Sequence, residues 1–312
     1  MTSVIDTTAL TKRFGSVTAL HPLDLSVPAG SIFGVIGPNG AGKTTLMRLL
    51  LDVLRPTSGS ATVLGASPRA GGPALRRQIG FLPGELRLEG RVTGRALLRH
   101  FADISGPVAP GTIDALADRL NLDLSRTVRT LSKGNKQKLG LVQAFMHEPR
   151  LLVLDEPTSG LDPLVQQEFL TMVREARSNG QTVFLSSHVL SEIQQVADSV
   201  AILRSGRLVS VSDVESLRVS AVRRVRVGIT GSTPTLVRDT LSSLPHLTDL
   251  DVSDDAPSDG VPVRVAATIE GDIDPFIKLI ARFSVADLAV EEPDLEESVL
   301  RLYSTPEVSD GV

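Results

Sequence analysis

The residues with the clearest chemical potential form a glycine-rich segment with the pattern G-x-x-x-x-G-K-[ST], in which Lys43 and Thr44 follow the second glycine. Glycines allow a loop to curl so that its backbone N–H groups point inward and bind phosphate oxygens. Lys43 would contact the β- and γ-phosphates of a nucleoside triphosphate, and the Thr44 hydroxyl would bind Mg²⁺. The expected phosphate-binding residues are Gly37, Pro38, Asn39, Gly40, Ala41, Gly42, Lys43, Thr44 and Thr45.

The surroundings of this loop are those that a phosphate site requires. Residues 31–36 are an apolar run that predicts a buried strand, and residues 43–54 have the spacing of a helix. Leu46, Leu49 and Val53 fall on one face of that helix. The start of a helix carries a partial positive charge, which favours phosphate. An incidental glycine-rich turn is the alternative, but the full pattern in this context favours a nucleotide site.

A second candidate site begins where four apolar residues, 151–154, are followed by Asp155 and Glu156. The carboxyl end of a buried strand is where ligands of such sheets bind. Asp155 could hold Mg²⁺, and Glu156 could polarise an attacking water as general base. Alone, this pattern is equally compatible with solvated acids at a strand end. Together with the phosphate loop, it predicts nucleotide hydrolysis.

Composition limits the function classes. The 312-residue chain is 41% hydrophobic and 22% charged, as in globular proteins with a sizeable core. A net charge of -4 and 3% aromatic residues argue against nucleic acid as a partner. The absence of cysteine excludes disulfides and thiolate chemistry.

The sequence also lacks the patterns of a secretory signal and of a membrane span. The acidic residue Asp6 follows only five residues after the start, and no basic stretch followed by an apolar stretch precedes it. The longest apolar runs are far shorter than the roughly 20 residues that cross a bilayer. Any role at a membrane is therefore expected to depend on a partner.

The order of elements predicts an α/β domain followed by a smaller one. Further strands are expected at 151–154 and 182–185, then a helix at 189–198 and a hairpin at 200–211. This alternation favours a largely parallel sheet. Between about residues 90 and 147 the pattern is helical, which indicates a helical subdomain inserted in a domain of residues 1–218.

Residues 219–312 form the predicted second domain. Strand-like and helical stretches alternate there in the order β-α-β-β-α-β, with a polar loop at 254–260 and a last helix at 295–303. This order is ferredoxin-like and predicts a small α+β domain. The acidic segment at 291–297 is more typical of a solvated helix start than of a site.

Shortly before Asp155, the segment Leu131, Ser132, Lys133, Gly134 and Asn135 resembles the signature motif of ABC ATPases, Leu-Ser-Gly-Gly-Gln. Residues 159–162, ending at Asp162, look like the D-loop of that family. His188 looks like its switch histidine, and Phe14 matches the aromatic residue that stacks on adenine. Each element alone has an ordinary interpretation, since Ser132 could simply cap a helix and His188 could lie in a core. Their common order over residues 10–211 identifies the chain as a member of the family.

The resemblance implies a P-loop NTPase fold, ATP and Mg²⁺ as cofactors, and a head-to-tail dimer with a second copy of the chain. Each ATP would contact the phosphate loop of one copy and Ser132 and Gly134 of the other, with Leu131, Lys133, Asn135 and Asp162 close by. His188 would contact the same γ-phosphate, so that Glu156, His188 and Lys43 form the catalytic group. The family also implies an integral membrane permease as partner, and a peripheral location on the cytoplasmic face of the cell membrane.

Two parts of the sequence depart from the family pattern. The signature has Lys133 where glycine is usual and Asn135 where glutamine is usual. The larger departure is Gly84, where family members carry a glutamine that binds Mg²⁺ and links the site to the membrane subunit. Glu85 could substitute, but from a different backbone position. We therefore expect Mg²⁺ to have one fewer protein ligand.

Three functions remain open at this point. The signature, the segment around Gly84 and the stretch 290–302 resemble drug and antibiotic exporters with separate membrane subunits, which is the favoured interpretation. An importer subunit is the second, but the regulatory domains of importers are usually small β-barrels, and helices are predicted here. A ribosome- or DNA-acting ATPase is the third; its members carry two cassettes or a long coiled coil, which this chain lacks.

Overall fold

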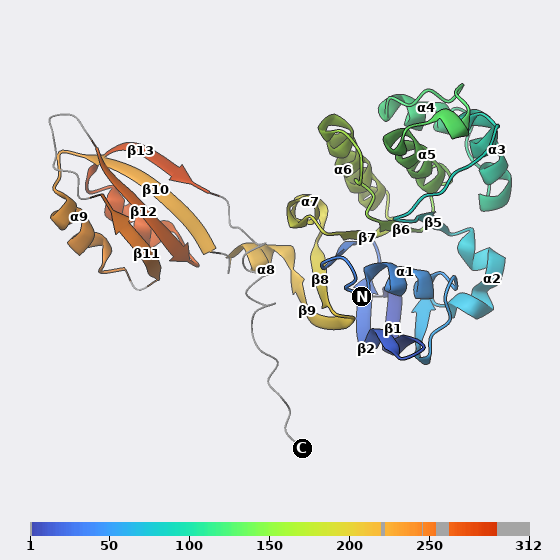
Figure 1. Cartoon of the computed structure of the whole chain (residues 1–312), viewed down its shortest axis with the longest axis horizontal. Coiled ribbons are helices and arrows are strands. Elements are labelled where there is room, and N and C mark those ends of the chain that lie inside the picture. Colours follow the sequence, from blue (N-terminus) through green and yellow to red (C-terminus); the bar gives the residue numbers. More distant parts are fainter. Residues whose placement is uncertain (1, 220–221, 245, 254–261, 292–312) are drawn as a thin grey trace, which may run out of the picture. The chain divides into compact units, whose positions relative to one another are not determined.

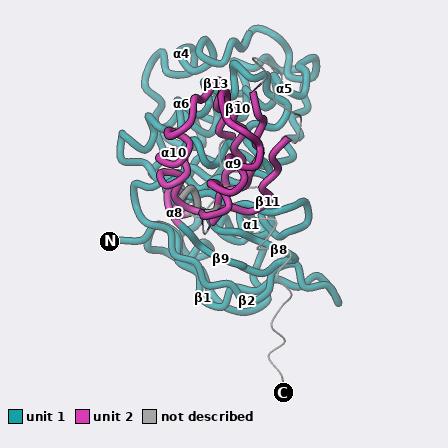
Figure 2. Tube along the Cα trace, turned by 90° about the vertical axis from the view of Figure 1, so that its left-hand side faces the viewer, with its two compact units in different colours: residues 1–212 teal, residues 213–312 magenta. Residues whose placement is uncertain are grey.

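The computed structural model describes residues 2–219, 222–244, 246–253 and 262–291. The chain divides into two compact units, residues 1–212 and 213–312 (Figure 2). The helix α8 (Val214–Val219) begins just after this division, and the boundary predicted after residue 218 falls near its end. The polar loop predicted at 254–260 and the helix predicted at 295–303 lie outside the described residues.

A six-stranded sheet forms the centre of the first unit (Figure 1). Its neighbouring strands from β5 to β8 pair in parallel, and β9 follows β8 after a short turn, as the predicted hairpin requires. All side chains of β3, β6 and β7 are buried, which explains why these strands are recognisable as short apolar runs. In sheet order the strands are β5 (Ile79–Leu82), β6 (Leu151–Asp155), β7 (Thr182–Ser187), β3 (Ile32–Ile36), β8 (Ser199–Arg204) and β9 (Arg207–Asp213).

A second, antiparallel sheet has the order β2 (Val17–Pro28), β1 (Ser3–Phe14), β4 (Ser58–Val63). This sheet was not predicted from the sequence. Register shifts interrupt the pairing of β1 with both neighbours, and Ala9 has a left-handed φ of 46°. These bulges break the regular alternation of buried and exposed residues by which a strand is recognised.

The helix after the phosphate loop, α1 (Lys43–Leu50), is shorter than predicted. The N–H groups of Val53 and Leu54 both donate to the carbonyl of Arg48, and Asp52 has a left-handed φ of 57°. This closes the helix before Val53, which is 59% exposed instead of lying on the apolar face. Leu46 and Met47, by contrast, join a core cluster with side chains of both sheets.

The predicted helical segment between residues 90 and 147 contains α3 (Gly94–Ser105), α4 (Thr112–Arg119), the short 3₁₀ helix η1 (Val128–Thr130) and α5 (Lys133–Phe145). The helices α3 and α4 pack against α5, and α5 contacts β5, so that the three form one group (Figure 1). The remaining helices of the unit are α2 (Pro68–Arg76), α6 (Pro163–Ser178) and α7 (Leu190–Val196).

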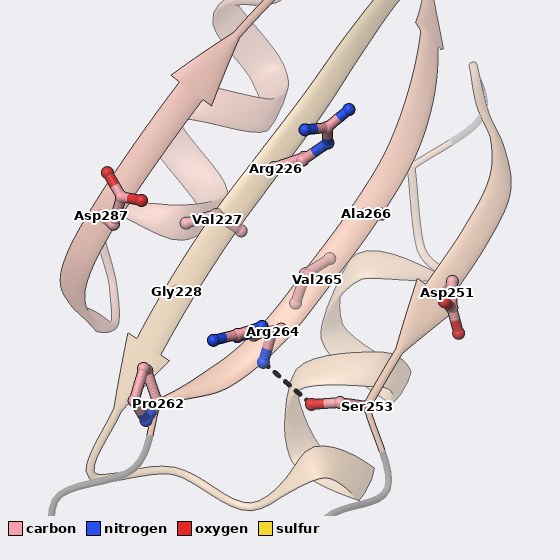
Figure 3. A pocket seen from close by; sticks show the side chains of 10 residues that line it. All are labelled: Arg226, Val227, Gly228, Asp251, Ser253, Pro262, Arg264, Val265, Ala266 and Asp287. Atoms are coloured by element: carbon pink, nitrogen blue, oxygen red, sulfur yellow. Dashed lines mark hydrogen bonds between the residues drawn. The ribbon is translucent and has the colours of Figure 1, made fainter.

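The described residues of the second unit form one four-stranded antiparallel sheet and, after α8, the two helices α9 and α10. Alternate residues of β10, such as Val225 and Val227, lie in a core that also includes residues of both helices. The face of the sheet opposite to this core has a pocket of about 530 Å³ (Figure 3). Arg226, Arg264 and Gly228, which has no side chain, are among the residues that line it. The elements are β10 (Val222–Thr230), α9 (Pro234–Leu241), β11 (Leu247–Val252), β12 (Val263–Glu270), α10 (Asp274–Ile280) and β13 (Ser284–Val290).

Candidate functional site

The glycine-rich loop connects β3 to α1, as predicted. Close packing requires one of its glycines, and the backbone conformation requires another. A Cβ atom on Gly37 would lie 2.3 Å from the carbonyl oxygen of Leu203. Gly42 has a φ of 106°, which residues with side chains rarely adopt. The tip of the loop, residues 38–40, is exposed. The backbone can therefore curl around a ligand while its base stays anchored in the sheet.

Lys43, at the first position of α1, is only 6% exposed. Its Nζ donates to the carbonyl oxygen of Gly37 at 2.6 Å and lies 3.2 Å from Oε1 of Glu156. A buried ammonium group is costly unless anionic or acceptor groups surround it. The sequence thus places a positive charge at the centre of the loop, directly beside the proposed general base.

Thr44 and Asp155 meet at the end of β6. The Thr44 hydroxyl donates to Oδ2 of Asp155 at 2.7 Å, and Ser186 donates to Oδ1 at 2.6 Å. Asp155 is 1% exposed and Ser186 is fully buried. Hydroxyl and carboxylate oxygens are ligands that Mg²⁺ accepts, usually together with phosphate oxygens and water. These residues therefore fit a Mg²⁺–nucleotide site.

Glu156 has an unusual backbone, with a φ of 49°. Such a conformation costs on the order of 1–3 kcal/mol in a residue other than glycine and persists only where the surroundings hold it. Its N–H donates to the Ser186 hydroxyl at 3.1 Å, and its Oε2 is 2.6 Å from Nδ1 of His188. The carboxylate therefore lies between an ammonium group and an imidazole, a suitable place for a group that orients and deprotonates water.

The motif of residues 131–135 lies at the start of α5. Ser132 is its N-cap, and the Ser132 hydroxyl accepts a hydrogen bond from the N–H of Asn135 at 3.2 Å. A Cβ on Gly134 would lie 2.6 Å from the carbonyl oxygen of Gly160. Ser132 and Lys133 are exposed. Within the described part of the chain, no hydrogen bond or ion pair joins this motif to the phosphate loop, so one chain does not bring the two together.

The other predicted residues lie at ends of elements. Phe14 is the last residue of β1 and is 48% exposed, with Nζ of Lys12 4.9 Å from the ring centroid. Asp162 caps α6 by accepting from the N–H of Val165, and this hydrogen bond lowers the pKa of the Asp162 carboxyl below its usual range. Both groups are thus accessible, one as a flat ring and one as an ionised carboxylate.

Gly84 lies directly beside the carboxylate of Asp155. A Cβ atom at this position would be 3.0 Å from Oδ2 of Asp155, so a side chain here would start toward the site. Glu85 does not take this role in the structure. Its carboxylate accepts from Arg87 at 2.7 Å and is 67% exposed.

Sequence reasoning missed two residues that build the site. Ser186 binds both Asp155 and Glu156, as described above. Glu192 accepts hydrogen bonds from Thr158 at 2.7 Å and from Ser187 at 3.0 Å, which joins the segment after Glu156 to the segment before His188. Ser186 lies two residues before the proposed switch histidine, and its position at the end of a predicted strand was the available signal.

The fold and the site together define the class of protein. The site consists of a strand, a glycine-rich loop and a helix, together with a second strand, two positions away in the sheet, that leads into two acids. This is the nucleotide site of a P-loop NTPase. The ABC transporter family model matches residues 20–159. A solved ATP-binding subunit of an ABC transporter superposes with a TM-score of 0.65 and 29% identity, covering 69% of this chain and 92% of that one.

Two curated proteins are similar over about two thirds or more of this chain. A bacitracin transport ATP-binding protein of Enterococcus faecalis is 34% identical over 257 residues, which are 81% of this chain and 83% of the relative. A daunorubicin resistance ATP-binding protein of Streptomyces coeruleorubidus is 38% identical over 66% of this chain and 67% of the relative. The chain therefore belongs to the ATP-binding proteins of ABC transporters, and it is an ATPase.

The role of Ser186 gives a prediction for stability. In Ser186→Ala, the Glu156 N–H and one oxygen of Asp155 lose their partner in a buried place, which should lower the free energy of unfolding by about 1–3 kcal/mol. Urea unfolding, followed by circular dichroism, would measure the change. Ser178→Ala, which removes an exposed hydroxyl on α6, should stay within about 0.5 kcal/mol. Equal effects of the two substitutions would contradict the proposed anchoring.

Proposed function

We propose that this chain is the ATP-hydrolysing subunit of an exporter that removes an antibiotic, drug or lipid-like substrate through a separate membrane permease. The alignment with the bacitracin transport protein carries this proposal. It covers 81% of the chain, more than the 212 residues of the first unit, so the similarity continues into the second unit. The similarity to a daunorubicin resistance protein supports the same substrate classes.

The second unit also favours this function over the importer alternative. We propose that it is a ferredoxin-like accessory domain, with its boundary near residue 218. Its β-α-β-β-α-β order, the strand order β11-β12-β10-β13 and the antiparallel pairing of all neighbours support this assignment. Helices α9 and α10 contribute to its core, unlike the small β-barrels expected of importer subunits.

The proposed location is the cytoplasmic face of the cell membrane, where the chain would bind its permease. Among the described residues, no helix is long and apolar enough to cross a membrane. The permease would supply both the membrane path and the recognition of the substrate.

We assign the nucleotide contacts as follows. The N–H groups of the loop and Lys43 hold the phosphates, and Phe14 stacks on adenine. Thr44 and Asp155 would hold Mg²⁺, which would neutralise phosphate charge when it is bound. Glu156 orients and deprotonates the attacking water, and His188 contacts the γ-phosphate beside it.

A second copy of the chain completes the site. The exposed start of α5 presents the Ser132 hydroxyl and the N–H groups of Lys133 and Gly134, and the N-terminus of a helix favours an anion. In a head-to-tail dimer, these groups, with Leu131, Asn135 and Asp162 near them, would contact the γ-phosphate held by the loop of the other copy. ATP would close the dimer, and hydrolysis would reopen it.

The assignment of the base is testable with Glu156→Gln. The variant should bind ATP as wild type does, lose turnover by about a hundredfold or more, and accumulate as an ATP-bound dimer. Phosphate release and size-exclusion chromatography with ATP and Mg²⁺ would measure these properties. Hydrolysis at the wild-type rate would refute the role of Glu156, while loss of ATP binding would mean that the substitution damages the loop instead.

The direction of transport is testable in cells of the source organism that lack this chain. They should accumulate more of a labelled peptide antibiotic or anthracycline than the parent strain. Wild-type chain should restore low accumulation, and Glu156→Gln should not. Reduced uptake of a nutrient would support an importer instead, and unchanged transport with a translation or DNA-repair defect would support a soluble ATPase.

Because Gly84 has no side chain to reach the site, we expect this chain to bind Mg²⁺ with lower affinity than a chain with glutamine at this position. In Gly84→Gln, the added amide oxygen should lower the Mg²⁺ concentration for half-maximal ATPase activity by up to about tenfold. Gly84→Ala is the matched control, since it crowds Asp155 equally and adds no ligand. If wild type and both variants gave identical Mg²⁺ titrations, the missing-ligand hypothesis would be wrong.

A further inference from the structure

Gln137, in the second turn of α5, lies near the site and has no role in the assignments above. Its side chain is buried, and its Nε2 donates to two consecutive backbone carbonyls, Glu156 at 3.2 Å and Pro157 at 3.0 Å. A side-chain amide group has two N–H donors, so one glutamine satisfies both carbonyls. The first of these carbonyls belongs to the residue that carries the proposed general base.

The Glu156 backbone is held from opposite sides. Its N–H donates to Ser186 of β7, and its carbonyl accepts from Gln137 of α5. Since its φ of 49° is unfavourable for a glutamate, these contacts determine where the side chain starts. A small rotation of this peptide would move the carboxylate relative to the water that it must orient.

The start of the same helix is docked on the residues that follow Glu156. Gly134 packs so closely on the Gly160 carbonyl that a Cβ would lie 2.6 Å away. The ammonium group of Lys138, whose side chain is 9% exposed, lies 3.6 Å from Oδ2 of Asp162. Gln137 therefore belongs to a continuous contact between residues 134–138 and residues 156–162.

This contact joins two half-sites within one chain. Glu156 acts on the ATP held by its own loop, whereas Ser132 and Gly134 face the ATP held by the partner. Through its two hydrogen bonds, Gln137 would transmit a movement of the start of α5 to the peptide of Glu156. Beyond Thr158, the hydrogen bonds of Glu192 continue the connection to Ser187, the neighbour of His188.

We propose that Gln137 is a positioning residue that sets the backbone of Glu156 and couples the base of one ATP site to the signature motif serving the other. The proposal rests on the proposed function, because the coupling requires the head-to-tail dimer. It predicts that Gln137 affects turnover and cooperativity but not the affinity for ATP.

The first test compares Gln137→Leu with Gln143→Leu. Both remove a glutamine of α5, and among the described residues the Gln143 side chain has no hydrogen bond. Gln137→Leu should lower kcat about tenfold to a hundredfold, because the base is misplaced, and should reduce the Hill coefficient for ATP toward one. The Kd of a fluorescent ATP analogue should stay within about twofold of wild type, and Gln143→Leu should behave as wild type.

A second variant keeps the test decisive if Gln137→Leu folds poorly. Gln137→Glu preserves size, but an ionised carboxylate has no proton to donate to the two carbonyls. Protonation restores one donor, so kcat relative to wild type should rise as the pH falls. A purely structural role would give a ratio independent of pH, and that result, or an unchanged kcat in both variants, would overturn the proposal.

The dimer provides a separate readout. Combined with Glu156→Gln, Gln137→Leu should still form the ATP-bound dimer on size-exclusion chromatography, since the signature itself is intact. Loss of this dimer would show that Gln137 acts on nucleotide binding and would contradict the proposal. If Glu156→Gln alone formed no dimer with ATP, the proposed function would fail instead, so the two failures are distinguishable.

Discussion

The hydrogen bond between Thr44 and Asp155 is the contact on which the rest of the site depends, because it joins the phosphate loop to the end of β6. Beside it, Lys43 and Glu156 form an ion pair at 3.2 Å. These two contacts link the residues proposed to hold the triphosphate to the residue proposed to orient the attacking water. Because Lys43 and Asp155 are buried, the low local dielectric constant strengthens both contacts.

The sheet order explains why residues more than a hundred positions apart meet here. The strands β6, β7 and β3 are neighbours and run parallel, so the residues after their carboxyl ends lie along one edge of the sheet. That edge receives the loop after β3, the two acids after β6 and His188 after β7. The same arrangement brings Ser186 between Asp155 and Glu156 without any recognisable motif.

Much of this could be predicted from the sequence, for physical reasons that differ between elements. Fully buried strands such as β3 and β6 are visible as apolar runs, and the glycine pattern requires a specific backbone shape. The bulged strands β1 and β2 were not predicted, since their alternation is broken. The end of α1 was placed too late, because a left-handed residue at Asp52 has no clear signal. The partners of Glu156, Gln137 and Ser186, depend on tertiary contacts that spacing along the chain does not reveal.

Charge balance offers a reason for the pairing of Lys43 with Glu156. A buried ammonium group needs an anionic neighbour, and Glu156 supplies one in this structure. The γ-phosphate of ATP would bring stronger negative charge to the same ammonium group and compete with Glu156 for it. The carboxylate, which already contacts His188, would then be free to turn toward water, while Gln137 and Ser186 hold its backbone in place. In this arrangement the substrate itself would release the proposed base, so that the carboxylate would become available only when a phosphate is bound.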